Sequence, residues 1–271
     1  MTNHHGDFIW YELLTSDADA AADFYGRVLG WTSEPSEQPG MDYRMLSMPG
    51  EEAVAGLMAI TPDMAAQGAQ PAWLGYVGVD DVDKMAVSIR DGGGAVHMEP
   101  DDIPGVGRFA FVADPQGALF YIMRGTSDEE SLSFSYDTPR IGHCAWNELA
   151  TTDVEAAKHF YGQRFGWVKD GEMDMGPMGT YEFLRHAGRA PDGSPMGAGM
   201  LGAVMPKLPE DPQSHWLYYF RIPDIDAAVV HIEANGGRIH IPPAEIPGGD
   251  YSLAAADPAG AYFGLVGSRK G

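Results

Sequence analysis

The stretch GDFIWYELLTSDADAAADFYG at residues 6–26 is repeated, with substitutions, at residues 142–162, which read GHCAWNELATTDVEAAKHFYG. Both copies run on to a glycine–tryptophan pair, at residues 30–31 and 166–167. Each copy reads as a strand, an acidic helix start, an amphipathic helix and a glycine that ends it. The chain is therefore an internal duplication, and a residue kept in both copies is a better site candidate than one present once.

Composition limits the classes of function. A chain of 271 residues with a formal net charge of −22 is long enough for two domains, and it repels phosphate backbones and anionic lipid surfaces. Nucleic acid and membranes are therefore not expected as partners. The first residues are polar and carry no apolar run, and the single cysteine, Cys144, cannot close an internal disulfide. We expect a cytoplasmic protein that is a monomer or a homodimer.

A second block of sequence completes each copy. The segment from Trp73 onward repeats from Trp216, and each segment ends with a turn of the form Asp-Pro-x-Gly, at residues 114–117 and 257–260. The patterns predict an α+β fold of four βαβββ modules, near residues 6–61, 72–125, 142–206 and 215–268.

The polar stretch 126–139 has no periodicity and is predicted to link the two halves. It would separate a first domain over residues 1–125 from a second over residues 140–271. The sequence leaves open whether the first module closes on the second or on the fourth.

These motifs resemble the vicinal-oxygen-chelate superfamily, which includes glyoxalase I, extradiol dioxygenases and bleomycin-resistance proteins. The resemblance rests on the Phe-Tyr-Gly helix end followed by Gly-Trp, and on Asp-Pro-x-Gly before the last strand of each half. It implies two open barrels with helices on the outside, each barrel surrounding a cavity. The fold hosts several chemistries and some pure binding proteins, so it does not by itself name a function.

The resemblance also implies where metal ligands would stand. The first-strand ligand position falls on Trp10 and Trp146, the next on Leu74 and Leu217, and the last-strand glutamate position on Tyr121 and Gly264. None of these is a usual metal ligand. The sequence therefore predicts no metal site and no cofactor in either half.

Residues at the lost ligand positions define the expected cavities instead. Because side chains alternate along a strand, Glu12 should face the same way as Trp10, and Glu148 the same way as Trp146. We predict Glu12 and Glu148 as catalytic acid–base groups, although a carboxylate at these positions could equally be a paired structural group. The predicted ligand-binding residues are Trp10, Tyr76, Tyr121, Trp146, Tyr219 and Arg221.

The histidines give a weaker signal. His97 and His240 occupy matching places after a Gly-Gly pair, which would suit a general base or a ligand, but an exposed strand histidine is the commoner case. Tyr76 and Tyr219 are matched as well, whereas Tyr121 and Arg221 each stand in one half only. The two cavities are thus expected to differ, with at most one of them active.

Three functions remain open from sequence. The first is a metal-free protein that binds a small apolar or aromatic molecule in its barrel cavities and turns it over through a glutamate. The second is a metal-dependent lyase or dioxygenase with displaced ligands, and the third is a non-catalytic interaction protein. Glutamine at positions 12 and 148 would distinguish turnover from binding in the first.

Overall fold

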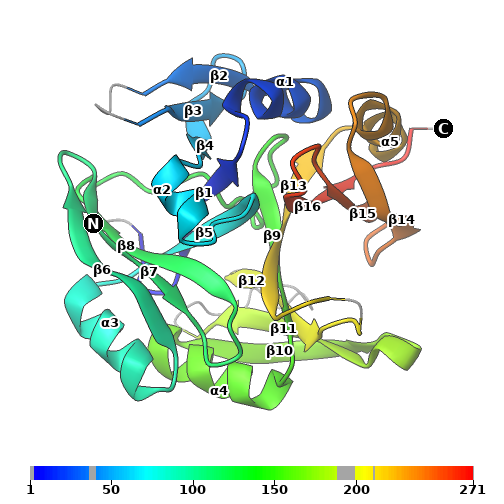
Figure 1. Cartoon of the computed structure of the whole chain (residues 1–271). Helices are drawn as coiled ribbons and strands as arrows, with labels where there is room; N and C mark the ends of the chain where they lie inside the picture. The colour runs from blue at the N-terminus through cyan, green and yellow to red at the C-terminus, as the bar shows by residue number, and fades with distance from the viewer. Residues whose placement is uncertain (1–2, 37–40, 188–198, 210, 271) are drawn as a thin grey trace. The chain divides into compact units, whose positions relative to one another are not determined.

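The structure is a computed structural model that describes residues 3–36, 41–187, 199–209 and 211–270. It has the predicted α+β architecture, with two eight-stranded mixed sheets and few helices (Figure 1). Among the described residues, no helix is both long and apolar enough to cross a membrane.

The first half forms one sheet, in the strand order β2-β3-β4-β1-β5-β8-β7-β6. Strand β1 runs parallel to β4, and β5 runs parallel to β8, while the hairpin pairs β2–β3, β3–β4, β6–β7 and β7–β8 are antiparallel. The elements are β1 (Phe8–Thr15), α1 (Ala18–Leu29), β2 (Thr32–Pro35), β3 (Tyr43–Ser47), β4 (Ala53–Ala59), α2 (Pro62–Ala66), β5 (Ala72–Gly78), α3 (Val82–Asp91), β6 (Ala95–Ile103), β7 (Gly107–Ala113) and β8 (Leu119–Gly125).

The second half repeats this sheet in the order β10-β11-β12-β9-β13-β16-β15-β14. Its parallel pairs are β9 with β12 and β13 with β16. The elements are β9 (Cys144–Thr151), α4 (Val154–Phe165), β10 (Trp167–Asp174), the short 3₁₀ helix η1 (Gly176–Met178), β11 (Thr180–His186), β12 (Met200–Pro206), β13 (His215–Ile222), α5 (Ile225–Ala234), β14 (Arg238–Glu245), β15 (Tyr251–Ala256) and β16 (Tyr262–Gly267).

Local sequence explains where the long helices begin and end. Asp17 and Asp153 accept hydrogen bonds from backbone N–H groups three residues later, at 3.0 Å in both copies. Gly30 and Gly166 end the same helices in the left-handed conformation, at φ 79° and 71°, which a side chain would strain. The short helix α2 was not predicted from the sequence, although Thr61 caps it and Pro62 begins it.

The chain divides into two compact units, and neither is a contiguous half. One contains residues 1–9, 75–131 and 146–216, and the other contains residues 10–74, 132–145 and 217–271. The second module therefore packs with the third, and the first packs with the fourth. The sheets, in contrast, join modules that follow each other in sequence. The predicted division at 126–139 follows the sequence repeat and stays a prediction.

A buried carboxylate joins two modules within each unit. In one unit the Asp257 carboxylate accepts a hydrogen bond from the Tyr25 hydroxyl at 3.2 Å, and Trp73 donates to the same hydroxyl at 2.8 Å. Asp257 also accepts from the N–H groups of Ala259 and Ala261, both at 2.9 Å, and so shapes the Asp-Pro-x-Gly turn. One side chain thus fixes the final hairpin of the fourth module to the helix of the first.

The other unit repeats this arrangement. Tyr161 donates to Asp114 at 3.1 Å and accepts from the indole of Trp216 at 3.1 Å. Asp114 accepts from the backbone of Ala118 at 2.8 Å. The two sequence motifs that carry the family resemblance, Phe-Tyr-Gly and Asp-Pro-x-Gly, therefore meet in space as one hydrogen-bonded chain.

Replacing Tyr25 with phenylalanine should lower the free energy of unfolding by about 1–3 kcal/mol, because the buried Trp73 N–H loses its acceptor and Asp257 loses a donor. Tyr161→Phe should have a similar cost. Urea denaturation would measure both, with Val230→Ala as the control, since Val230 is 64% exposed. A Tyr25→Phe protein as stable as the control would contradict this account.

The same carboxylates predict a pH effect. Burial raises the pKa of Asp114 and Asp257, and their hydrogen bonds offset this only in part. The folded state therefore binds protons more readily than the unfolded chain, so the ionisation of each group costs stability as pH rises from the ordinary carboxyl range through the raised pKa. In Asp257→Asn this loss is absent, so the stability advantage of wild type over the variant should shrink as pH rises. If urea titrations show that the difference in unfolding free energy between wild type and Asp257→Asn widens as pH rises over this range, the prediction is wrong.

Candidate functional site

A tryptophan–tyrosine hydrogen bond lies on one face of the first sheet. Trp10 of β1 donates from Nε1 to the hydroxyl of Tyr43 on β3, at 3.0 Å. Gly56 of β4 lies close to this bond, since a Cβ there would be 2.0 Å from the Tyr43 hydroxyl and 3.2 Å from the Trp10 nitrogen. Glu12, the residue in register with Gly56, is buried with 3% exposure. A glycine is thus required for the tyrosine to reach the indole.

The second copy extends the same bond to a carboxylate. Trp146 of β9 donates from Nε1 to the Tyr181 hydroxyl of β11 at 2.7 Å, and that hydroxyl donates to Glu148 Oε2 at 2.7 Å. The intervening strand carries Ala203, fully buried, in register with Glu148. The result is a directed chain from indole to phenol to a half-buried carboxylate.

Apolar side chains surround this chain. Tyr181, Ala203 and Met205 form a buried cluster against which partly buried residues pack. Phe183 meets Trp146 at 6.1 Å and Tyr181 at 5.9 Å between ring centroids, both edge-on. A soft apolar and aromatic surface next to one oriented carboxylate suits an organic ligand with a single polar group. The partly buried members are Trp146, Met173, Met175 and Phe183.

The last strands of the two halves, β8 and β16, carry different residues at the aligned positions 121 and 264. Tyr76 and Tyr121 are in register in the first half and stack at 4.3 Å. Tyr219 is in register with Gly264 in the second half, and its ring occupies the space of a side chain there, because a Cβ on Gly264 would be 2.3 Å from Tyr219 Cδ1. In each half, a tyrosine ring thus occupies the place where the resemblance implies a last-strand ligand.

The remaining predicted residues have other surroundings. Arg221 forms an ion pair with Asp250 at 2.9 Å, so its charge is already balanced, and its role in ligand binding stays a prediction. His97 and His240 are exposed on β6 and β14, near the rings of Phe111 and Tyr262. Desolvation of part of the ring, together with the positive charge of Arg238, lowers the pKa of His240.

Tyr43 and Tyr181 were not predicted as site residues from the sequence. The signal was present, since both follow the helix of their module and stand at matching places in the two copies. They were missed because their strands have no motif, and only the pairing of β3 with β4 and of β11 with β12 places them near the first strands.

Comparison with known proteins agrees with this fold. The family model described as the glyoxalase/bleomycin resistance protein/dioxygenase superfamily matches residues 8–122 and again residues 140–265. The chain belongs to this superfamily.

Its relatives extend over almost the full chain. A candidate glyoxylase of Mycobacterium tuberculosis, CFP32, is 32% identical over 95% of this chain and 93% of its own length. The anthracycline biosynthesis protein DnrV of Streptomyces peucetius is 33% identical over 97% and 93%. The Mn(II)-bound glyoxalase of Novosphingobium aromaticivorans has a TM-score of 0.62 at 16% identity, over 98% of this chain and 83% of that one, a likeness of fold alone.

The metal that this fold can hold does not fit the side chains found here. Trp10 and Trp146 offer only indole N–H donors, and each is already bonded to a tyrosine. Leu74 and Leu217 are buried hydrocarbon, and Gly264 has no side chain. Among the described residues, no group of three or more His, Cys, Asp or Glu side chains is placed to bind a metal ion.

Replacing Gly56 with alanine should displace Tyr43, because the new methyl group would overlap its hydroxyl. We expect a loss of about 1–3 kcal/mol in unfolding free energy, typical of overpacking, and a changed ¹⁵N–¹H indole signal for Trp10. Gly125→Ala is the control, since its nearest atom is 3.8 Å from the added Cβ. An unchanged Trp10 signal in Gly56→Ala would show that the Trp10–Tyr43 bond does not form.

Proposed function

We propose that the protein binds an aromatic organic molecule on the surface formed by Trp146, Tyr181, Phe183, Met173 and Met175, with Glu148 as its polar contact. The observation that carries this proposal is the directed hydrogen-bond chain from Trp146 through Tyr181 to Glu148. A carboxylate that accepts from a phenol is oriented, and the aromatic and methionine side chains around it are partly accessible.

Two further observations support an aromatic ligand. The matched relative DnrV is named for anthracycline biosynthesis, whose products are planar polycyclic compounds, and it covers 97% of this chain. Edge-on rings such as Phe183 and Trp146 pack well against a planar aromatic system, while methionines adapt to its outline. The aligned position in the first copy carries Met45 in place of Phe183, so the second copy is the more aromatic.

Glu148 would also act as an acid–base group on the bound molecule. A carboxylate next to an apolar surface can accept a proton from an acidic C–H or O–H of a ligand and return it. The Tyr181 hydroxyl, which donates to Glu148 Oε2, would hold the carboxylate in one orientation throughout. No metal is required for such a proton transfer, and no step through one is proposed.

Binding can be tested with a neutral dihydroxyanthraquinone. Calorimetry should detect binding to wild type, and the Trp146 indole resonance should shift on titration. Phe183→Ala should weaken binding about tenfold, which corresponds to about 1.4 kcal/mol for a lost aromatic contact. Met178→Ala is the matched control, because Met178 lies nearby in sequence but is 41% exposed. Equal affinity in Phe183→Ala and wild type would place the ligand elsewhere.

Proton transfer needs a separate test. Anthrone has an acidic methylene, and a general base should catalyse its exchange with deuterated solvent, which proton NMR follows directly. We expect Glu148→Gln to lose the catalysed exchange while it binds the neutral anthraquinone within about threefold of wild type. Glu12→Gln serves as the comparison in the other copy. Exchange that persists in Glu148→Gln would remove this residue from the mechanism.

A further inference from the structure

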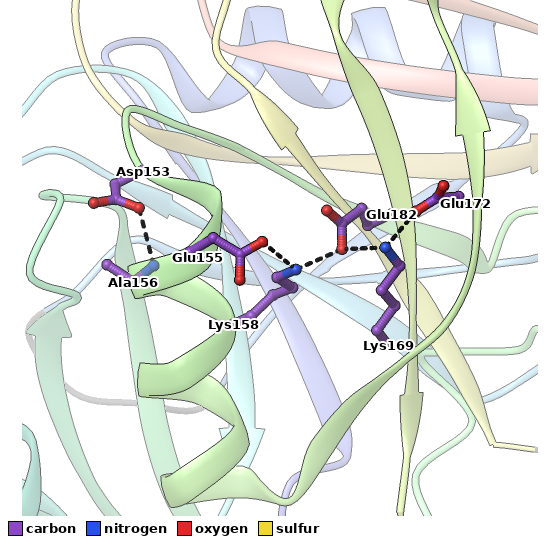
Figure 2. Close-up of polar contacts among 7 residues, drawn as sticks. All are labelled: Asp153, Glu155, Ala156, Lys158, Lys169, Glu172 and Glu182. Atoms are coloured by element: carbon purple, nitrogen blue, oxygen red, sulfur yellow. Dashed lines mark hydrogen bonds and ion pairs between the residues drawn. The ribbon is translucent and has the colours of Figure 1, made fainter.

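An ion-pair cluster lies on the other face of β11, directly behind the candidate site. Glu182, which follows Tyr181, has a side chain that is only 9% exposed and contacts Lys158 at 2.7 Å and Lys169 at 3.0 Å. Figure 2 shows both lysines converging on this carboxylate, Lys158 from α4 and Lys169 from β10. Each lysine also pairs with a more exposed carboxylate, Lys158 with Glu155 and Lys169 with Glu172.

The cluster fixes the position of Glu182. Burial tends to raise the pKa of Glu182, but the two ammonium groups outweigh this effect, so the pKa lies below its usual range. Removing one partner of a buried ion pair is more costly than removing both, because it leaves a charge without compensation. Glu182 is therefore held between the helix and the neighbouring strand.

The strand geometry transmits this constraint to Tyr181. Consecutive side chains on a strand point to opposite faces, so Glu182 faces α4 while Tyr181 faces Trp146 and Glu148. The ladder between β11 and β12 runs from Glu182 paired with Val204 to Arg185 paired with Met200. Glu182 thus stands at the end of the ladder, where Tyr181 continues the strand, and the ion pairs anchor that end.

The first copy holds the equivalent tyrosine with the charges reversed. Arg44, which aligns with Glu182 and follows Tyr43, contacts Asp19 of α1 at 2.8 Å and Asp42 at 2.9 Å. At the positions that align with Lys158 and Lys169, the first copy has Ala22 and Ser33. In the first copy the cation stands on the strand that carries the tyrosine, whereas in the second copy the two cations stand on the helix and on the neighbouring strand β10. What both copies keep is a charged contact between strand and helix beside a tyrosine that bonds to a tryptophan.

We propose that Glu182 and Lys158 are positioning residues that set the hydrogen bonds of Tyr181, and through them the orientation of Glu148. Their effect on ligand binding rests on the function proposed above, whereas their effect on Tyr181 does not. Neither residue touches the ligand surface, since both act from the helix-facing side of β11.

The ¹⁵N–¹H indole resonance of Trp146 tests this directly, because its N–H donates to Tyr181. Tyr181→Phe gives the reference for a lost bond. We expect Glu182→Gln to move the Trp146 resonance toward that reference and to leave Trp10 in place, whereas Arg44→Gln should do the reverse. Glu172→Gln, which alters only the more exposed end of the cluster, should move neither. In Glu182→Gln, affinity for dihydroxyanthraquinone should fall about fivefold.

A rescue variant distinguishes a positioning role of Glu182 from a general loss of local structure. K158A/K169S/T180D/E182R copies the first-copy arrangement into the second: it places an arginine opposite Glu155, which aligns with Asp19, and beside an acidic side chain at position 180, which aligns with Asp42. We expect this variant to return the Trp146 resonance close to its wild-type position and to restore affinity.

Two results would overturn the inference: a Trp146 resonance unchanged in Glu182→Gln, or one that the rescue variant fails to restore. If wild type does not bind the anthraquinone at all, the proposed function fails, yet the indole resonances still decide the positioning role.

Discussion

A tyrosine hydroxyl bonded to a buried aspartate is the interaction on which the rest of this structure depends. Tyr25 with Asp257, and Tyr161 with Asp114, each connect the helix of one module to the final turn of another. The aspartate also accepts from backbone N–H groups of its own turn, so one carboxylate shapes a hairpin and attaches it. Because these carboxylates are buried, every donor around them is needed, and both motifs are kept in both copies.

Because these contacts lie on the helix-facing side of each sheet, residues on the opposite face can differ between the two copies. The helix-facing side carries the shared hydrogen-bonded chains, while the first strands present Trp10 and Trp146 on the other side. Where the copies align, Phe111 and Tyr121 of the first half correspond to Ala254 and Gly264 of the second. A duplicated fold can thus change the size and chemistry of its cavities without disturbing the contacts that hold the modules together.

The charged cluster around Glu182 also differs between the two copies, while the contact that it makes between strand and helix is kept. Its polarity differs from that of Arg44 in the first copy, but both sit one residue after a site tyrosine and reach a helix. Coulombic attraction and hydrogen bonding do not depend on which partner carries the positive charge, so either polarity can hold a strand in place. The tyrosine, in contrast, is the same in both copies, and in the second copy its hydroxyl accepts from an indole and donates to a carboxylate at once.

Sequence alone determined the modules, the helix limits and the face that Trp146 shares with Glu148, because capping, periodicity and strand alternation act over a few residues. Together with the family resemblance, it also placed tryptophan, leucine, tyrosine and glycine at the usual ligand positions. Only the tertiary structure decided that the first module packs with the fourth, and that Arg221 meets Asp250. It also brought Tyr181 to Glu148, a partner 33 residues away in the chain. Such pairings depend on strand order and on burial between distant segments, and no local pattern in the sequence encodes them.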